Sequence, residues 1–150
     1  MVISIFFCIF AEIVYNVMIK KIKSYKDIQN GDIIMLYGAS DKGKIVQKRY
    51  LKIESTANNG PRDVIIWNRC YVVREDGSHI KDRWSWSNKL CQLFYNKNLG
   101  KFSCTDGTYN TYYIDPKIPC EIVIKRLKEE KMKINKKIVD CQNYMYKISD

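Results

Sequence analysis

Between residues 32 and 114, short segments rich in β-branched and aromatic residues alternate with breaks that contain glycine or asparagine. The segments span 32–38, 44–55, 63–73, 79–87, 89–96, 101–104 and 108–114. Such runs are typical of strands, and the breaks are too short for the crossovers that parallel strands require. Asp76-Gly77 and Asp106-Gly107 favour tight hairpins. We therefore predict a mainly β (α+β) chain in which 27–115 form an antiparallel meander of six or seven strands, closed as a barrel or packed as a sandwich.

A long helix is predicted after this region, because residues 120–148 contain neither Gly nor Pro and Pro119 suits the first turn of a helix. Apolar residues recur there at alternating spacings of four and three, as in a coiled coil. The a positions are Ile124, Lys131, Ile138 and Met145, and the d positions are Cys120, Leu127, Ile134, Cys141 and Ile148. We call these nine residues the heptad stripe. Lys131 is its one charged member, and a single Lys at an a position can fix register or oligomeric state.

Two interpretations of this helix, over residues 116–150, remain open. The stripe can contact a partner helix or a second copy, and the interaction residues are then Ile124, Leu127, Lys131, Ile134, Ile138 and Met145. Alternatively, the helix lies across its own β domain. A 29-residue helix is about 43 Å long, which exceeds the width of a small β domain, so part of the stripe would stay uncovered. The e and g positions show little charge complementarity, which counts against a dedicated parallel zipper.

The N-terminal segment is apolar, with Glu12 as the only charged residue in 1–19. We predict a hydrophobic helix with a basic flank over 1–26. It is long enough to approach a bilayer span, and membrane contact would involve residues 1–23. Polar residues recur every four positions from Ser4 to Lys20, which suits an interfacial helix as well as a spanning one. A helix packed on the protein's own core is the alternative.

Four lysines follow the apolar segment and form what we call the basic cluster: Lys20, Lys21, Lys23 and Lys26. Under the positive-inside rule, an anchored chain would keep its main domain on the cytoplasmic side. Lysine outnumbers arginine 20 to 6, a composition typical of AT-rich genomes such as those of large DNA viruses, protists or low-GC bacteria. A membrane-associated protein or a virion component therefore fits the sequence, and a soluble cytoplasmic protein is the alternative.

The net charge of +10 raises the question of nucleic-acid binding. The aromatic and basic residues that could stack on bases and contact phosphates are Trp84, Trp86, Lys89 and Tyr95. However, residues 27–115 contribute only +3 of the charge, whereas 20–26 and 116–150 contribute +4 each. Nucleic acid is thus a possible partner of this chain but not the favoured one, and aromatic residues in a small β domain more often form its core.

Signals for catalysis, cofactors and metals are weak. Residues 38–45, GASDKGKI, resemble a phosphate-binding loop, but Ile45 replaces the Ser or Thr that would hold Mg²⁺ and a β-rich run follows in place of a helix. A hairpin turn explains the same residues. His79 and the cysteines at 70, 91 and 104 would have to meet in space to form a Cys/His site, and no Cys-x-x-Cys pair is present. We expect no cofactor, no metal site and no catalytic residues.

These features together favour a non-catalytic structural or protein-interaction protein, with membrane anchorage and a place in a virion compatible with the sequence. The contacts would come from the β domain and from the C-terminal helix. A nucleic-acid-binding protein that uses its basic surface and exposed aromatic residues is the first alternative. A small Cys/His enzyme is the second and is less favoured.

Overall fold

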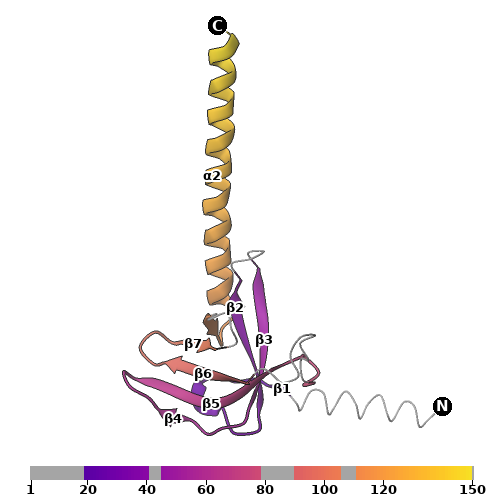
Figure 1. The fold of residues 1–150 in the computed structure, drawn as a ribbon, viewed down its shortest axis with the longest axis vertical. Coiled ribbons are helices and arrows are strands. Elements are labelled where there is room, and N and C mark those ends of the chain that lie inside the picture. Colours follow the sequence, from indigo (N-terminus) through magenta and orange to yellow (C-terminus); the bar gives the residue numbers. More distant parts are fainter. Residues whose placement is uncertain (1–18, 41–44, 79–89, 106–110, 150) are drawn as a thin grey trace, which may run out of the picture.

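The computed structural model describes residues 19–40, 45–78, 90–105 and 111–149. Six antiparallel strands form a closed barrel, and one helix projects from it (Figure 1). The barrel strands are β2 (Ile33–Ala39), β3 (Val46–Ile53), β5 (Val64–Val73), β6 (Leu90–Asn96), β7 (Lys101–Cys104) and β8 (Thr111–Tyr113). Each strand pairs with the next, and β8 returns to pair with β2. This arrangement confirms the predicted antiparallel β domain and selects the barrel over the sandwich.

Alternate side chains along the strands fill the barrel, as the two-residue period of a strand requires. The fully enclosed residues include Ile34, Leu36, Leu51, Ile53, Trp67, Leu93, Phe102 and Tyr112. Trp67 is the largest of them, and its indole Nε1 has no hydrogen-bond partner. The aromatic residues of the domain therefore contribute much of its core.

Irregularities near β5 change which residues face inward. A bulge between Trp67 and Cys70 shifts the pairing of β5 with β6, and both of these side chains remain buried on either side of it. The two-residue strand β4 (Asn58–Asn59) pairs with the other end of β5. The turn that leads into β5 places Arg62 and Asp63 at positive φ, 57° and 58°.

The predicted N-terminal helix is wrong for the part that the structure describes. Ile19–Lys20 forms strand β1, which pairs in parallel with β2, and Tyr25–Asp27 forms a short 3₁₀ helix, η1. Ile22, between these elements, packs against the barrel core and is 7% exposed. Residues 19–28 therefore belong to the barrel. Residues 1–18, which carry the rest of this prediction, lie outside the described residues.

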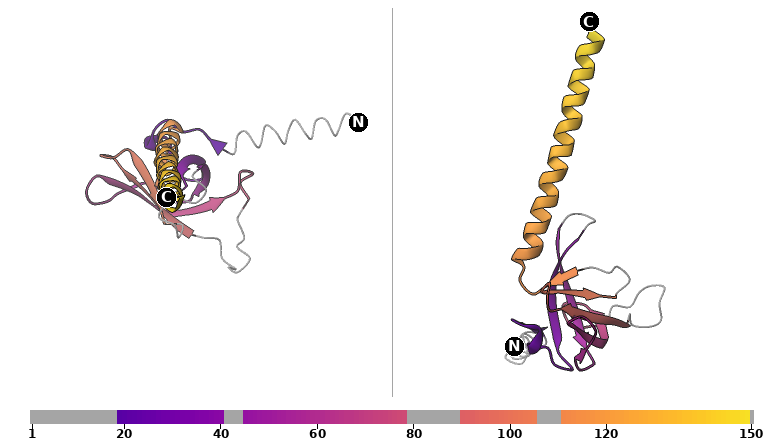
Figure 2. Two further views of the ribbon diagram at one scale, coloured as in Figure 1. Left: turned by 90° about the horizontal axis from the view of Figure 1, so that it is seen from above. Right: turned by 90° about the vertical axis from the view of Figure 1, so that its left-hand side faces the viewer.

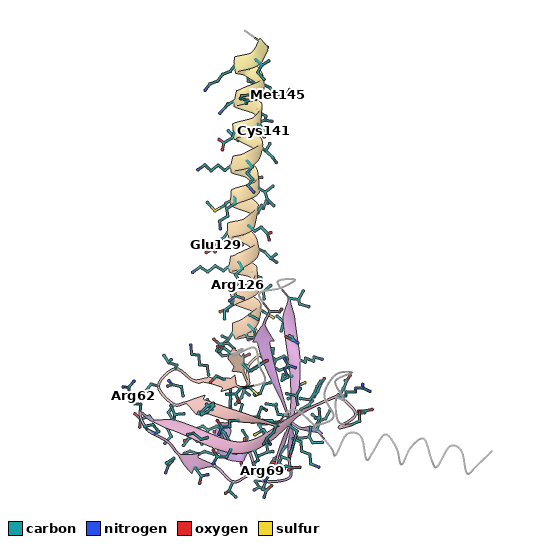
Figure 3. The ribbon with its side chains drawn as sticks, viewed as in Figure 1. Arg62, Arg69, Arg126, Glu129, Cys141 and Met145 are labelled. Atoms are coloured by element: carbon teal, nitrogen blue, oxygen red, sulfur yellow. The ribbon has the colours of Figure 1, made fainter. Side chains whose placement is uncertain are left out.

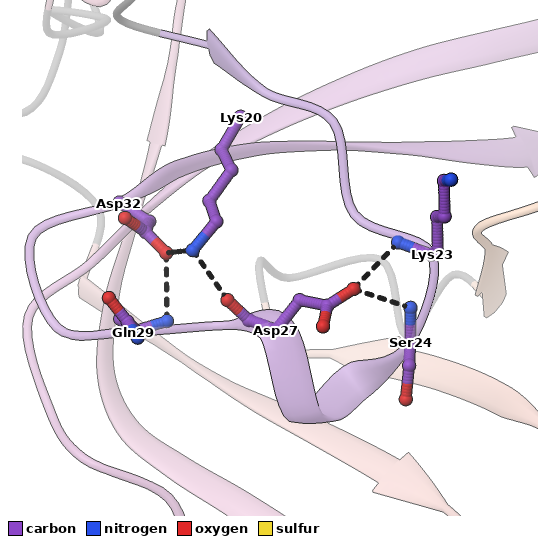
Figure 4. Close-up of polar contacts among 6 residues, drawn as sticks. All are labelled: Lys20, Lys23, Ser24, Asp27, Gln29 and Asp32. Atoms are coloured by element: carbon purple, nitrogen blue, oxygen red, sulfur yellow. Dashed lines mark hydrogen bonds and ion pairs between the residues drawn. The ribbon is translucent and has the colours of Figure 1, made fainter.

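A network of polar contacts fixes this N-terminal segment (Figure 4). Lys20 Nζ lies 3.0 Å from Asp32 Oδ2 and also donates to the carbonyl of Asp27 at 2.7 Å. The Asp27 carboxylate accepts hydrogen bonds from the backbone N–H groups of Lys23 and Ser24, both at 3.0 Å. Ser24 caps η1 in return, which completes a capping box.

Helix α2 (Lys117–Ser149) lies within the predicted C-terminal segment and begins slightly before Pro119. Asp115 Oδ1 accepts a hydrogen bond from the backbone N–H of Lys117 at 2.9 Å, which satisfies one of the free donors at the helix start. At 33 residues, α2 is about 50 Å long. It extends well beyond the end of the barrel in Figure 1 and in the right-hand view of Figure 2.

Candidate functional site

The base of α2 docks on the barrel through one narrow face. Pro119 and Val123 are buried there, and Ile122, Arg126 and Glu130 are half-buried. The helix contacts β2 and β8, which form the pair that closes the barrel, and β3, which lies beside β2. In heptad terms these five residues occupy c, f and g positions. The docking face is therefore not the heptad stripe.

The stripe is exposed along its whole length, beginning beside the barrel. Ile124 is 51% exposed and Leu127 is 46% exposed, although both lie in the part of α2 that docks. Further along, the exposed fractions are 50% for Ile134 and Ile138, 69% for Met145 and 66% for Ile148. Lys131 and the cysteines at 120 and 141 are also exposed. Figure 3 shows Cys141 and Met145 on the projecting part, far beyond Arg126 at the base.

The projecting part of α2, residues 131–149, has no buried or half-buried residue. It carries five lysines and one aspartate, a net charge of +4. Lys133, Lys136 and Lys147 lie on the side of the helix opposite the stripe, as the angular spacing of 100° per residue dictates. This part of α2, which we call the projecting arm, is therefore amphipathic: the heptad stripe is apolar and the opposite side of the helix is basic.

Of the residues predicted for nucleic-acid binding, the structure describes Tyr95 alone. Trp84, Trp86 and Lys89 lie outside the described residues. Tyr95 stacks on Tyr25 with ring centroids 4.6 Å apart and packs against Phe102 at the same distance. Its side chain is half-buried and packs against the barrel core.

A surface that the sequence analysis missed lies on the outside of β2, β3 and β5. Tyr37 faces Lys48 on one neighbouring strand and Tyr113 on the other, and Lys52 faces Tyr71. The tyrosines are half-buried. The alternation in 46–53 could have indicated this face, but only the pairing of β2 with β8 brings Tyr37 and Tyr113 side by side.

One tyrosine of this outer surface already has an acidic neighbour. Burial raises the pKa of Tyr50, and the negative charge of the Glu75 carboxylate raises it further. Glu75 also places a negative charge at the edge of the surface. The outer surface is therefore less favourable for phosphate groups near Glu75, because like charges repel.

The basic cluster is divided by the fold. Lys20 is held by Asp32 and the Asp27 carbonyl, so its charge is largely neutralised. Lys21, Lys23 and Lys26 are exposed on the segment around η1. Within the described residues, no helix combines the length and apolar character needed to cross a membrane.

The cysteines proposed for a Cys/His site lie in the barrel interior. Cys70, Cys91 and Cys104 are buried and unbridged, and Cys91 Sγ lies 3.3 Å from the carbonyl oxygen of Cys70. Burial raises the pKa of the Cys70 thiol to about 12, so it remains protonated at neutral pH and is a poor nucleophile. His79 lies outside the described residues. Among the described residues, no group of three or more His, Cys, Asp or Glu side chains could hold a metal ion.

The segment that resembles a phosphate-binding loop joins two strands. Gly38 is a buried residue within β2, and the backbone N–H of Ser40 donates to the carbonyl of Ile45 at 2.9 Å, which closes a hairpin into β3. A phosphate-binding loop must be followed by a helix, so the hairpin interpretation is confirmed. Residues 41–44 lie outside the described residues.

Comparison with protein-family models, with curated proteins and with solved structures finds no match to this chain.

Proposed function

We propose that this chain is a non-catalytic structural or interaction protein that associates through the heptad stripe of α2, with a second copy of itself as the partner. The observation that carries the proposal is the difference between two faces of one helix. The docking face secures the base of α2 to the barrel, while the stripe beside it keeps six large apolar residues about half exposed or more. An apolar stripe of this length that is exposed to solvent is typical of an interaction site.

The exposure of the projecting part of α2 also favours self-association. A helix without tertiary contacts is marginal in water, and the last 19 residues of α2 are all exposed within the described structure. Burial of the stripe against a second helix would stabilise it by about 25 cal/mol for each Å² of apolar surface removed from water. The barrel then acts as a compact platform from which the arm projects.

The experiment is light scattering after size exclusion on the full chain and on two double variants. Ile134→Ala/Ile138→Ala removes apolar surface from the stripe without lowering helix propensity. Met132→Ala/Val139→Ala is the matched control, because these residues are 71% and 50% exposed on the same part of α2 but off the stripe. We expect the stripe variant alone to shift from dimer to monomer. A wild-type chain that is monomeric at all concentrations tested, or an equal effect of both variants, would contradict the proposal.

Nucleic-acid binding is retained as a second candidate because of the lysine and tyrosine pairs on the outer face of the barrel. Lys48 and Lys52 lie on the same face of β3, on either side of Tyr50. If this face binds single strands, Lys48→Ala/Lys52→Ala weakens binding to a labelled oligonucleotide, and wild-type affinity falls steeply as salt increases. Binding that is insensitive to both changes would exclude this face.

A further inference from the structure

The heptad stripe also contains information on how two copies would be oriented. Resting on the self-association proposed above, we propose that two α2 helices pair antiparallel, with Lys131 opposite the partner's Cys141. The two barrels then lie at opposite ends of the pair. Three features of the described residues lead to this orientation: the order of residues in the stripe, the position of Lys131, and the face of α2 that the barrel already covers.

The order of residues in the stripe is suited to an antiparallel pair. In such a pair, a positions of one helix lie opposite d positions of the other. With the symmetry axis at Lys136, Ile124 meets the partner's Ile148, Leu127 meets the partner's Met145, and Ile134 meets the partner's Ile138. All six strongly exposed apolar residues of the stripe are then matched with one another.

The position of Lys131 separates the two orientations electrostatically. A parallel, in-register pair places Lys131 against the partner's Lys131 inside the seam, where two ammonium groups lose water and repel each other. An antiparallel pair places it against a cysteine. The like charges that then meet are Lys137 and the partner's Lys137, which flank the seam at g positions, where water and salt screen them.

The barrel itself disfavours the parallel orientation. In a parallel pair, Val123 at a g position would contact the partner's Lys128, but Val123 is only 7% exposed because its own barrel covers it. Glu130, the next g residue, is half-buried. The same obstruction would occur twice in a symmetric pair, with the two barrels side by side. The antiparallel pair separates the domains, and its contact ends beside Val123, where Ile124 meets the partner's Ile148.

The stripe offers enough surface for a stable pair. Six apolar side chains, each about half exposed or more, supply roughly 600 Å² per copy, and e and g residues add to this, against about 800 Å² per partner in a standard interface. The exposed apolar surface of the stripe, together with its flanking residues, is therefore close to that of a standard interface.

Single-cysteine cross-linking distinguishes the orientations. In a Cys8→Ser/Cys120→Ser background, Cys141 faces its own counterpart only in a parallel pair. Adding Cys141→Ser and Lys137→Cys places one thiol on the g flank, where it lies near its counterpart only in an antiparallel pair. Cys141→Ser with Val139→Cys in the same background is the control for random collision, since Val139 is exposed but off the stripe. Cys70, Cys91 and Cys104 are buried and do not compete under native conditions.

After treatment with a short bismaleimide, we expect the Lys137→Cys chain to form covalent dimer several-fold more efficiently than the Cys141 chain and the control. Equal or more efficient cross-linking through Cys141 would overturn the antiparallel orientation. Light scattering of the unmodified variants identifies which proposal fails. Dimers without the expected pattern contradict the orientation alone, whereas monomers contradict the proposed self-association as well.

Discussion

The ring of Tyr112 packs directly against Gly38, at the point where β8 pairs with β2 and closes the barrel. A Cβ atom at residue 38 would lie 2.9 Å from two carbons of this ring. The ring cannot move freely, because Tyr112 is fully buried and its hydroxyl accepts a hydrogen bond from Arg49 Nε at 3.1 Å. Gly38 is therefore required by packing against a neighbouring strand.

We expect Gly38→Ala to destabilise the chain by about 1–3 kcal/mol, the usual cost of forcing extra volume into a packed core. Urea unfolding followed by tryptophan fluorescence measures this. Ser103→Ala, an exposed substitution in β7, is the control and should change the free energy of unfolding by less than about 0.5 kcal/mol. An equally small effect of Gly38→Ala would show that the barrel does not close in this way.

The carboxyl group of Asp27 should make the stability of the folded chain depend on pH. Hydrogen bonds from the backbone N–H groups of Lys23 and Ser24 lower the pKa of its carboxyl below the ordinary value of 3.8. The unfolded chain therefore takes up this proton at a higher pH than the folded chain does. The stabilisation is complete above about pH 5 and is lost as pH falls through the lowered pKa.

We thus expect Asp27→Asn to be less stable than wild type at neutral pH, with the difference shrinking towards zero in acid. Thermal unfolding at a series of pH values measures the difference between the two proteins. Asp140→Asn is the control, because Asp140 is exposed on the projecting arm, and it should show no such trend. A constant difference between Asp27→Asn and wild type at all pH values would contradict the carboxylate's role.

The described cysteines fall into two classes of reactivity. Cys120 and Cys141 are exposed on α2, whereas Cys70, Cys91 and Cys104 are buried in the barrel. We expect a maleimide to label the first two within minutes and the other three only after unfolding, as mapped by mass spectrometry of peptides. Rapid native labelling of Cys70 would be incompatible with a closed barrel and with a pKa of about 12.

Helicity of the projecting arm should depend on protein concentration. Residues 131–149 are all exposed within the described structure, so their helix gains stability when the stripe is buried. We expect the ellipticity per residue at 222 nm to weaken on dilution and to be weak at all concentrations in Ile134→Ala/Ile138→Ala. If helicity is constant over the dilution range in which the mass changes, the arm is helical without a partner.

Much of the barrel could be predicted from local sequence. The runs at 32–38, 63–73 and 101–104 correspond closely to β2, β5 and β7, because β-branched and aromatic runs bounded by turn residues constrain the backbone locally. The pairing of β8 with β2 joins distant parts of the chain and leaves no local signal. Strand β1 was missed because two residues at the end of an apolar run carry no strand pattern of their own.

The candidate site was predicted only in part. The four-and-three spacing identified the stripe, but it could not indicate which face of α2 docks on the barrel. The docking face includes Arg126 and Glu130, which are half-buried. Charged residues are usually exposed, so the sequence gives no sign that these two contact the barrel. A helix that lies on its own domain is expected to contact it through its most apolar face. In this structure the most apolar face of α2, the heptad stripe, is exposed.

The central claim is self-association through the stripe, and its most direct test is sedimentation equilibrium of the full chain at low and at moderate salt. The chain mass is 17.8 kDa. We predict a dimer of about twice that mass whose dissociation constant decreases as NaCl rises, because salt screens the two basic arms while apolar burial persists. A monomer at every concentration and salt level would contradict the account. So would a dimer that salt dissociates, because such a dimer would be held together by charge and not by the stripe.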